Sequence, residues 1–280
     1  MPLSTSSLRA RIESSLGQHL SSTLFLREKA APLTVSTGVA KLDALTGGLP
    51  RGALSEITGP VSSGRTSVML AALAGATRRE EACALVDASD SFDPASASAA
   101  GVDLDRLLWL RCSDNNSSSP RRSSRRSSLG RLEQVLKVTD LLLQGGGFGM
   151  VVLDFGDIPP ESARRVPLTS WFRFRRAVEP TATVLLVLEQ EPCAKTCASL
   201  VVRLQRIAMC ASNAALLLKE TEIHGWKVLS HAESAIPSAN EISHAALLQG
   251  MQLHAEVLRS WTQRKPVHSV GANFELRAAW

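Results

Sequence analysis

A nine-residue segment, GPVSSGRTS (59–67), constrains the fold of this chain more than any other stretch. It follows the short apolar run ALSEIT (53–58) and leads into a helical pattern over residues 65–79. Gly59 and Gly64 stand at the spacing of a phosphate-binding loop that joins a strand to a helix. Such glycines let the backbone curl, so that successive N–H groups and the helix N-terminus point at phosphate oxygens. The segment predicts a nucleotide-binding α/β core.

Other apolar runs alternate with helical segments along the chain. They are ACALVD (82–87), LLWLRC (107–112), MVVLDF (150–155) and TVLLVLEQ (183–190), with LLLKE (216–220) and WKVLS (226–230) as further candidates. Short β-rich runs separated by helices predict a mostly parallel central sheet flanked by helices on both faces. We place this core at residues 35–230.

The segments outside and within the core differ in composition from the strands. Residues 1–34 predict a helical arm, because Leu8, Ile12 and Leu16 recur at near-helical spacing. Residues 231–280 have weak periodicity, so we expect a helical or flexible tail, with a helix around 240–262.

An insertion at 113–131 is nearly all serine and arginine and lacks the apolar area needed to offset its ordering entropy. We expect a disordered surface loop there. Its five arginines are compatible either with solvent exposure or with contacts to phosphates, and the sequence leaves both open.

Overall composition restricts the partners only loosely. The net charge of +5 permits a polyanion but does not demand one. The chain has no tyrosine, so a stacking surface for single-stranded bases would be thin. The candidates for such stacking are Trp109, Trp171, Phe172 and Phe174.

Cysteine usage and hydropathy indicate the compartment. An odd number of cysteines, five, and the lack of a secretory start predict buried thiols in a reducing environment. Cys193 and Cys197 would fit on one helical turn, but no second ligand pair follows them, which disfavours a zinc site. No apolar stretch approaches the length of a membrane span, so we expect a cytoplasmic protein without a membrane partner.

The phosphate-binding loop assigns roles to individual residues. The residues expected to bind nucleotide are Gly59, Pro60, Val61, Ser62, Ser63, Gly64, Arg65, Thr66 and Ser67. Thr66 would place its hydroxyl on Mg²⁺, and Asp154, at the end of an apolar run, would hold the same ion from a Walker B position. Asp154 capping a turn is the alternative. Arg65 replaces the usual lysine with a longer, planar cation, which leaves the position of a terminal phosphate uncertain.

Several strings together resemble the opening of the bacterial RecA core. STG (36–38), GGLPRG (47–52), GPVSSGRTS (59–67), DASDSFDP (87–94) and GVDLDRLLWLR (101–111) occur in that family's order. The resemblance implies a RecA-like fold, with ATP and Mg²⁺ as cofactors and assembly with other copies of the chain. It also implies binding of single-stranded DNA and a role in DNA repair, recombination and the SOS response to DNA damage.

The same resemblance transfers roles unevenly. Gln190 matches a glutamine that senses the γ phosphate. The family's water-orienting carboxylate falls at Ser89, which cannot act as a general base, so hydrolysis of ATP is expected to be weak or absent. The loops expected to bind DNA are short. The arginines available near them are Arg164, Arg165, Arg173, Arg175 and Arg176, which would either contact DNA or form an exposed helix face.

The missing carboxylate at Ser89 and the short loops are typical of a second group, the ImuA-type RecA-like accessory proteins that accompany an error-prone polymerase. GGLPRGALSEI (47–57) and GRLEQVLK (130–137) resemble that group as well. The alternative function is then a non-catalytic adaptor that contacts a translesion polymerase or its accessory subunit.

Overall fold

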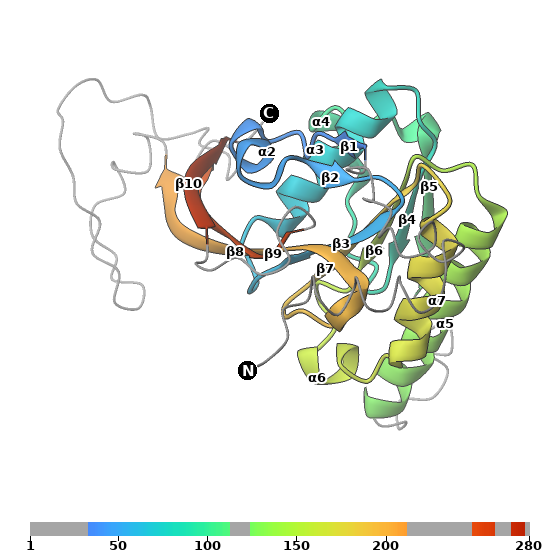
Figure 1. Ribbon diagram of the computed structural model, residues 1–280. Helices are drawn as coiled ribbons and strands as arrows, with labels where there is room; N and C mark the ends of the chain where they lie inside the picture. Colours follow the sequence, from blue (N-terminus) through green and yellow to red (C-terminus); the bar gives the residue numbers. More distant parts are fainter. Residues whose placement is uncertain (1–32, 113–123, 212–247, 261–269, 278–280) are drawn as a thin grey trace, which may run out of the picture. The chain divides into compact units, whose positions relative to one another are not determined.

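The computed structural model describes residues 33–112, 124–211, 248–260 and 270–277. Its centre is an eight-stranded sheet in the order β10-β9-β8-β3-β7-β6-β4-β5 (Figure 1). The strands are β3 (Ala53–Thr58), β4 (Cys83–Asp87), β5 (Leu107–Arg111), β6 (Met150–Asp154), β7 (Val184–Glu189), β8 (Ala198–Ala211), β9 (Leu248–Arg259) and β10 (Val270–Arg277). Strands β3 to β8 are parallel, whereas β9 and β10 are antiparallel to their neighbours. The predicted mostly parallel sheet is confirmed.

Helices cover both faces of the parallel strands (Figure 1). One face packs against α2 (Ala40–Thr46), α3 (Arg65–Arg78) and α4 (Pro94–Ala99), and the other against α5 (Ser124–Gly145), α6 (Pro160–Ala163) and α7 (Leu168–Val178). Met150 and Val152 of β6 belong to the α3 side of the core, and Val151 and Leu153 to the α5 side. Because both faces of these strands are buried, their sequences are continuous apolar runs and do not alternate with polar residues.

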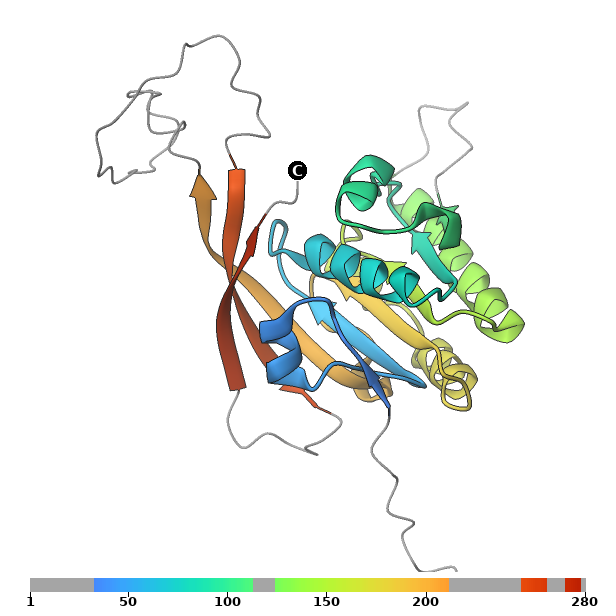
Figure 2. The same cartoon turned by 90° about the horizontal axis from the view of Figure 1, so that it is seen from above.

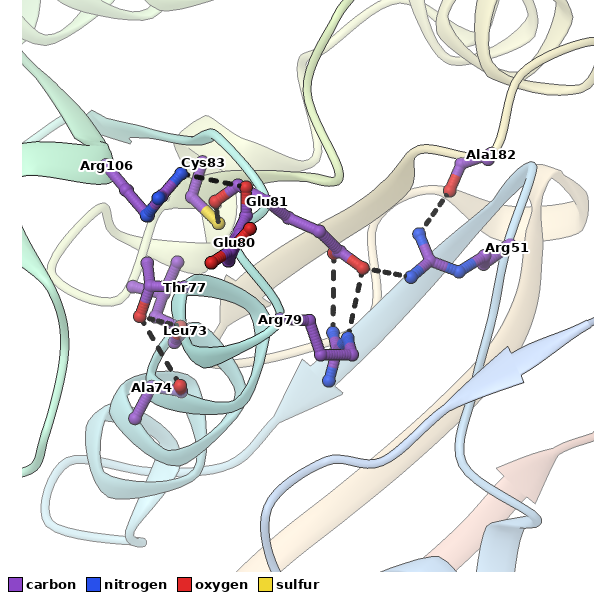
Figure 3. Close-up of polar contacts among 10 residues, drawn as sticks. All are labelled: Arg51, Leu73, Ala74, Thr77, Arg79, Glu80, Glu81, Cys83, Arg106 and Ala182. Atoms are coloured by element: carbon purple, nitrogen blue, oxygen red, sulfur yellow. Dashed lines mark hydrogen bonds and ion pairs between the residues drawn. The ribbon is translucent and has the colours of Figure 1, made fainter.

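At the amino ends of the strands, Arg51 connects three segments (Figure 3). Its guanidinium donates to the Ala182 carbonyl just before β7, at 2.8 Å, and pairs with Glu81 just before β4. Arg79, at the end of α3, donates to the same carboxylate at 3.0 Å. Burial tends to raise the pKa of Glu81, but the hydrogen bonds from Arg79 and Arg51 outweigh it and lower the pKa. This ion-pair group ties together the edge opposite the phosphate-binding loop.

Replacing Glu81 with glutamine is expected to lower the free energy of unfolding by roughly 0.5–1 kcal/mol at pH 7, because the pair is partly open to solvent. A lowered pKa stabilises the fold above the ordinary value of 4.5, and this contribution is lost as the pH falls through the folded-state pKa. The difference from the wild type should therefore shrink in acid. Urea unfolding at several pH values measures it, with the exposed Glu80→Gln as a matched control. Equal effects of both variants at pH 7 would contradict the assignment.

The serine- and arginine-rich insertion is shorter than its sequence predicts. Residues 113–123 lie outside the described ranges, but α5 begins at Ser124, within the expected disordered segment. Leu132 and Val135 are buried on the sheet, and Thr139 donates to the Val135 carbonyl at 2.8 Å. Once a helix is held by such packing, each residue added at its N-terminus gains a hydrogen bond at little further cost. The expected disorder over 124–131 is wrong for that reason.

The expected helix around 240–262 is also wrong in its described part. Residues 248–259 form β9, which pairs with β8 and β10 and extends the sheet on the side away from α5 (Figure 2). Leu253, Ala255 and Val257 are buried and alternate with more exposed polar residues, which is a period of two. The core therefore continues beyond residue 230. The strand candidates at 216–220 and 226–230, and the arm up to residue 32, lie outside the described ranges.

The short sheet of β1 (Thr34–Val35) and β2 (Leu49–Pro50) leads the chain into β3.

Within the described ranges, no helix has the length and apolar character needed to cross a bilayer.

Candidate nucleotide-binding site

The predicted phosphate-binding loop joins the carboxyl end of β3 to the first turn of α3. Gly59 passes close to other chain segments: a Cβ there would lie 2.3 Å from the Leu204 carbonyl oxygen and 2.6 Å from Ser63 Oγ. Gly64, at the N-cap of α3, has φ of +86°, a conformation that side chains strongly disfavour. Both glycines are thus required by the backbone. The loop geometry is that of the motif its sequence predicts.

Several hydrogen-bond donors in the loop have no acceptor among the described residues, and a bound anion would provide one. Ser63 Oγ and Arg65 Nη1 are buried without a hydrogen bond among the described residues. The N-cap Gly64 provides no side-chain cap, and the first N–H groups of a helix have no partner within it. Thr66 is exposed at the same helix start, so its hydroxyl is accessible to a bound ion. Orphaned donors at a helix N-terminus fit a polyphosphate.

Arg65 extends from α3 toward the loop after β6. Its Nη2 donates to the Gly156 carbonyl at 3.3 Å. Burial lowers its pKa, while Asp154, Asp157 and Glu189 act in the opposite direction. The guanidinium therefore lies near the carboxylates that follow β6 and end β7.

Asp154 ends β6 directly beside Asp87, which ends β4. Its Oδ1 accepts the Gly156 N–H at 2.8 Å. Burial, helped by the charges of Asp87 and Asp157, raises the pKa of Asp154 to about 6, against the opposing effects of Gly156 and Arg65. A divalent cation bound beside Asp154 would stabilise the ionised carboxylate, which burial otherwise disfavours. Asp154 thus caps the turn at Gly156, as the alternative from the sequence predicts, and its role as a magnesium ligand stays a prediction.

Gln190 follows β7 at the same edge of the sheet. Its Nε2 donates to the Gly156 carbonyl at 3.1 Å, so Gln190 and Arg65 converge on one acceptor. An open cavity of about 620 Å³ lies between Gly59, Pro60, Gln190 and the neighbouring loops. The ion pair of Arg164 and Glu191 lines the same cavity. The structure thus brings the loop, Asp154 and Gln190 to one edge of the sheet.

The loop after β4 carries no carboxylate in the expected water-orienting position. Asp87 is fully buried and accepts the N–H groups of Ser89, Ser91 and Phe92, at 3.1, 3.2 and 2.9 Å. It organises the loop instead of facing solvent. Ser89 Oγ is buried without a partner among the described residues. The nearby Asp90 pairs with Arg111 at 2.6 Å and is directed to the β5 edge.

Two aromatic candidates for base stacking are core residues. Trp171 and Phe174 are fully buried on α7, where their rings meet edge to face at 5.9 Å. The expectation that they stack on bases is wrong, because their helical spacing points both toward the sheet. Phe172 remains exposed and Trp109 is half-buried. Sequence alone did not distinguish the two faces of this helix.

The five candidate arginines lie on two segments, Arg164 and Arg165 directly after α6 and the other three on α7. Arg164 pairs with Glu191, and Arg173 pairs with Asp140 on α5 at 3.0 Å. Arg165 and Arg176 are exposed. Contact with DNA and a solvent-exposed helix face therefore both remain possible roles of this arginine group.

The predicted burial of the thiols is confirmed for Cys83, Cys112, Cys193 and Cys197.

Comparisons with known proteins agree with the geometry. The family described as the RecA N-terminal domain matches residues 5–159. The chain is 36% identical over 147 residues to Protein RecA of Rickettsia canadensis, which aligns 52% of this chain and 38% of that protein. It is 37% identical over 148 residues to Protein RecA of Allorhizobium ampelinum, which aligns 52% of this chain and 36% of that protein. The chain thus spans less than two fifths of the length of these relatives.

The family match covers more than half of the 280 residues and includes the phosphate-binding loop and Asp154. The parallel sheet and the loop at the carboxyl end of β3 are the structural counterpart of that match. On these grounds the chain belongs to the RecA family.

Proposed function

We propose that this chain is a RecA-like ATP-binding protein of DNA repair and recombination that binds single-stranded DNA and hydrolyses ATP weakly or not at all. The observation that carries the proposal is the loop at 59–67, which presents orphaned donors at the start of α3 beside Asp154. In this proposal Gly59 to Ser67 hold the phosphates. Thr66 and Asp154 hold Mg²⁺, which would neutralise the terminal phosphates when bound.

Gln190 and Arg65 would link the nucleotide to the neighbouring loops. Both side chains donate to the Gly156 carbonyl, and a phosphate bound by the loop would compete for those donors. Release of Gly156 would then change the loop after β6, which leads through α6 to Arg164 and Arg165, two of the arginines proposed to contact DNA. Weak hydrolysis follows from Ser89, which offers a hydroxyl where a carboxylate is needed to orient water.

The second candidate is a non-catalytic adaptor of the ImuA type that contacts a translesion polymerase. Two observations favour it: Arg65 is engaged with protein groups, and Asp87 and Asp90 are both committed to structural contacts. We place either function in the cytoplasm, and self-association belongs to the first.

Calorimetry tests the proposal directly. ATP with Mg²⁺ should bind in the micromolar range, and binding should strengthen when single-stranded DNA is present, because linkage between two sites is reciprocal. Adenosine, which lacks the phosphates, should bind far more weakly than ATP. Failure to bind ATP both with and without DNA would reject the first function and leave the adaptor as the leading one.

A further inference from the structure

Two glutamates lie side by side within the sheet, beneath the loop that follows Gln190. Glu56 is on β3 and Glu189 on the neighbouring β7, and the two side chains are 0% and 1% exposed. Cys193, on the loop after β7, is also buried. One carboxylate oxygen from each glutamate and Cys193 Sγ all lie within 4.8 Å of one another.

Among the described residues, backbone N–H groups reach one oxygen of each carboxylate. Glu56 Oε1 accepts the backbone N–H groups of Cys193 and Ala194, at 3.0 and 2.5 Å, and Glu189 Oε1 accepts that of Cys193 at 3.1 Å. The other oxygens, Glu56 Oε2 and Glu189 Oε2, are buried without a hydrogen bond among the described residues. Buried carboxylate oxygens without partners are costly, so the group needs a positively charged or proton-bearing occupant.

The described side chains supply little of that positive charge. Arg65 acts on Glu189 from α3, but its nearer interactions are with Asp154 and Asp157. Burial, a hydrogen bond with the Glu56 side chain and the charge of Glu56 raise the pKa of Glu189 well above its usual range, so the two carboxyl groups interact directly. Burial and the two neighbouring carboxylates likewise raise the pKa of Cys193. Three acidic groups that share one desolvated position disfavour their own ionisation unless a cation joins them.

We propose that Glu56, Glu189 and Cys193 form a binding site for one divalent transition cation of the zinc class. Zn²⁺ accepts thiolate and carboxylate ligands together, whereas Mg²⁺ and Ca²⁺ take oxygen ligands. Tetrahedral zinc holds its ligand atoms about 3–4 Å from one another, so side-chain adjustments of roughly 1 Å would close this group around the ion. A free carboxylate oxygen would complete the coordination, and binding would release the protons of the acidic groups.

Such an ion would cross-link three segments that adjoin the proposed nucleotide site. Glu56 lies on the strand that leads into the phosphate-binding loop, and Glu189 directly precedes Gln190. Cys193 lies in the short segment 191–199 that follows Gln190, where the family resemblance predicts a DNA-binding loop. The site is therefore structural: it fixes the loop after β7 relative to β3. The inference does not depend on the proposed function, because it concerns residues outside the phosphate-binding loop.

Cobalt titration of the full, reduced chain tests the site. Co²⁺ should bind at one equivalent and produce the near-ultraviolet absorption of a thiolate–cobalt bond, and Zn²⁺ should displace it and raise the melting temperature. Cys193→Ser should abolish the thiolate absorption and weaken Zn²⁺ binding roughly 100-fold or more. Cys197→Ser, which removes another buried thiol four positions along the chain, is the matched control and should leave both signals intact.

Two outcomes would overturn the proposal, and both are measured on the wild-type chain, so neither depends on whether a variant folds. The first is the absence of stoichiometric Co²⁺ or Zn²⁺ binding by the wild-type chain. The second is cobalt binding without thiolate absorption, which would place the ion at Asp154 or elsewhere. If the wild type binds no metal and Glu189→Gln raises the melting temperature, the carboxyl pair instead shares one proton. Loss of ATP binding in the calorimetric test would leave these readouts unchanged, so the two proposals fail separately.

Discussion

Replacing Gly64 with valine is expected to abolish nucleotide binding. The residue has φ of +86°, and a β-branched side chain is strongly strained in that conformation. A Cβ at this position would also lie 2.4 Å from Leu253 Cδ1 of β9. Relief of either conflict would move the N-terminus of α3, and the N–H groups that point at the phosphates would move with it. Calorimetry with ATP and Mg²⁺ should show no measurable heat of binding.

Two controls separate crowding from backbone strain. Leu253→Ala removes the close side chain, so Gly64→Val combined with Leu253→Ala retains only the strain from φ and should still fail to bind. Gly75→Ala changes a glycine in the last turn of α3, where the nearest described atom to a Cβ would be Arg79 Nη1 at 3.5 Å. It should bind ATP normally and gain roughly 0.5–1 kcal/mol of stability. Wild-type affinity in a folded Gly64→Val variant would show that phosphates bind elsewhere.

The elements that could be predicted from sequence are those whose signal is local. The strand before Gly59 is a continuous apolar run, and the helix after Gly64 begins where the glycine pattern ends. Because parallel strands place their carboxyl ends at one edge, the sequence alone predicts Asp154 and Gln190 beside this loop. Local pattern and chain topology agree here, so the central sheet and the positions of these residues at its carboxyl edge could be predicted.

The elements that were missed depend on packing between distant segments. Residues 251–257 alternate with a period of two, but β9 forms only because β8 provides a partner. The start of α5 at Ser124 follows from burial of Leu132 and Val135, whereas the composition around it is that of a loop. Glu56 and Glu189 are over a hundred positions apart in the sequence, and their proximity arises from the pairing of β3 with β7. No single-segment pattern carries such information.

Restoring two side chains should raise ATP hydrolysis. Arg65→Lys would give up the hydrogen bond to the Gly156 carbonyl and place a compact charge over the β and γ phosphates. Ser89→Glu would supply the missing carboxylate on the loop after β4, whose N–H groups are already held by Asp87. A positioned general base contributes about 100-fold or more to a rate. The double variant is therefore expected to exceed the wild-type steady-state phosphate release by about that factor.

The single variants determine whether both changes are needed. Arg65→Lys alone should strengthen binding of ATP relative to ADP with little gain in turnover, since no base orients the water. Ser89→Gln is nearly the same size as Ser89→Glu but cannot accept a proton as a carboxylate does, so its combination with Arg65→Lys should stay at the basal rate. A rate gain that appears with glutamine as well would point to loop repacking around the unpartnered Ser89 hydroxyl. No gain in any variant would mean that the distance between this loop and the phosphates, and not its chemistry, prevents hydrolysis.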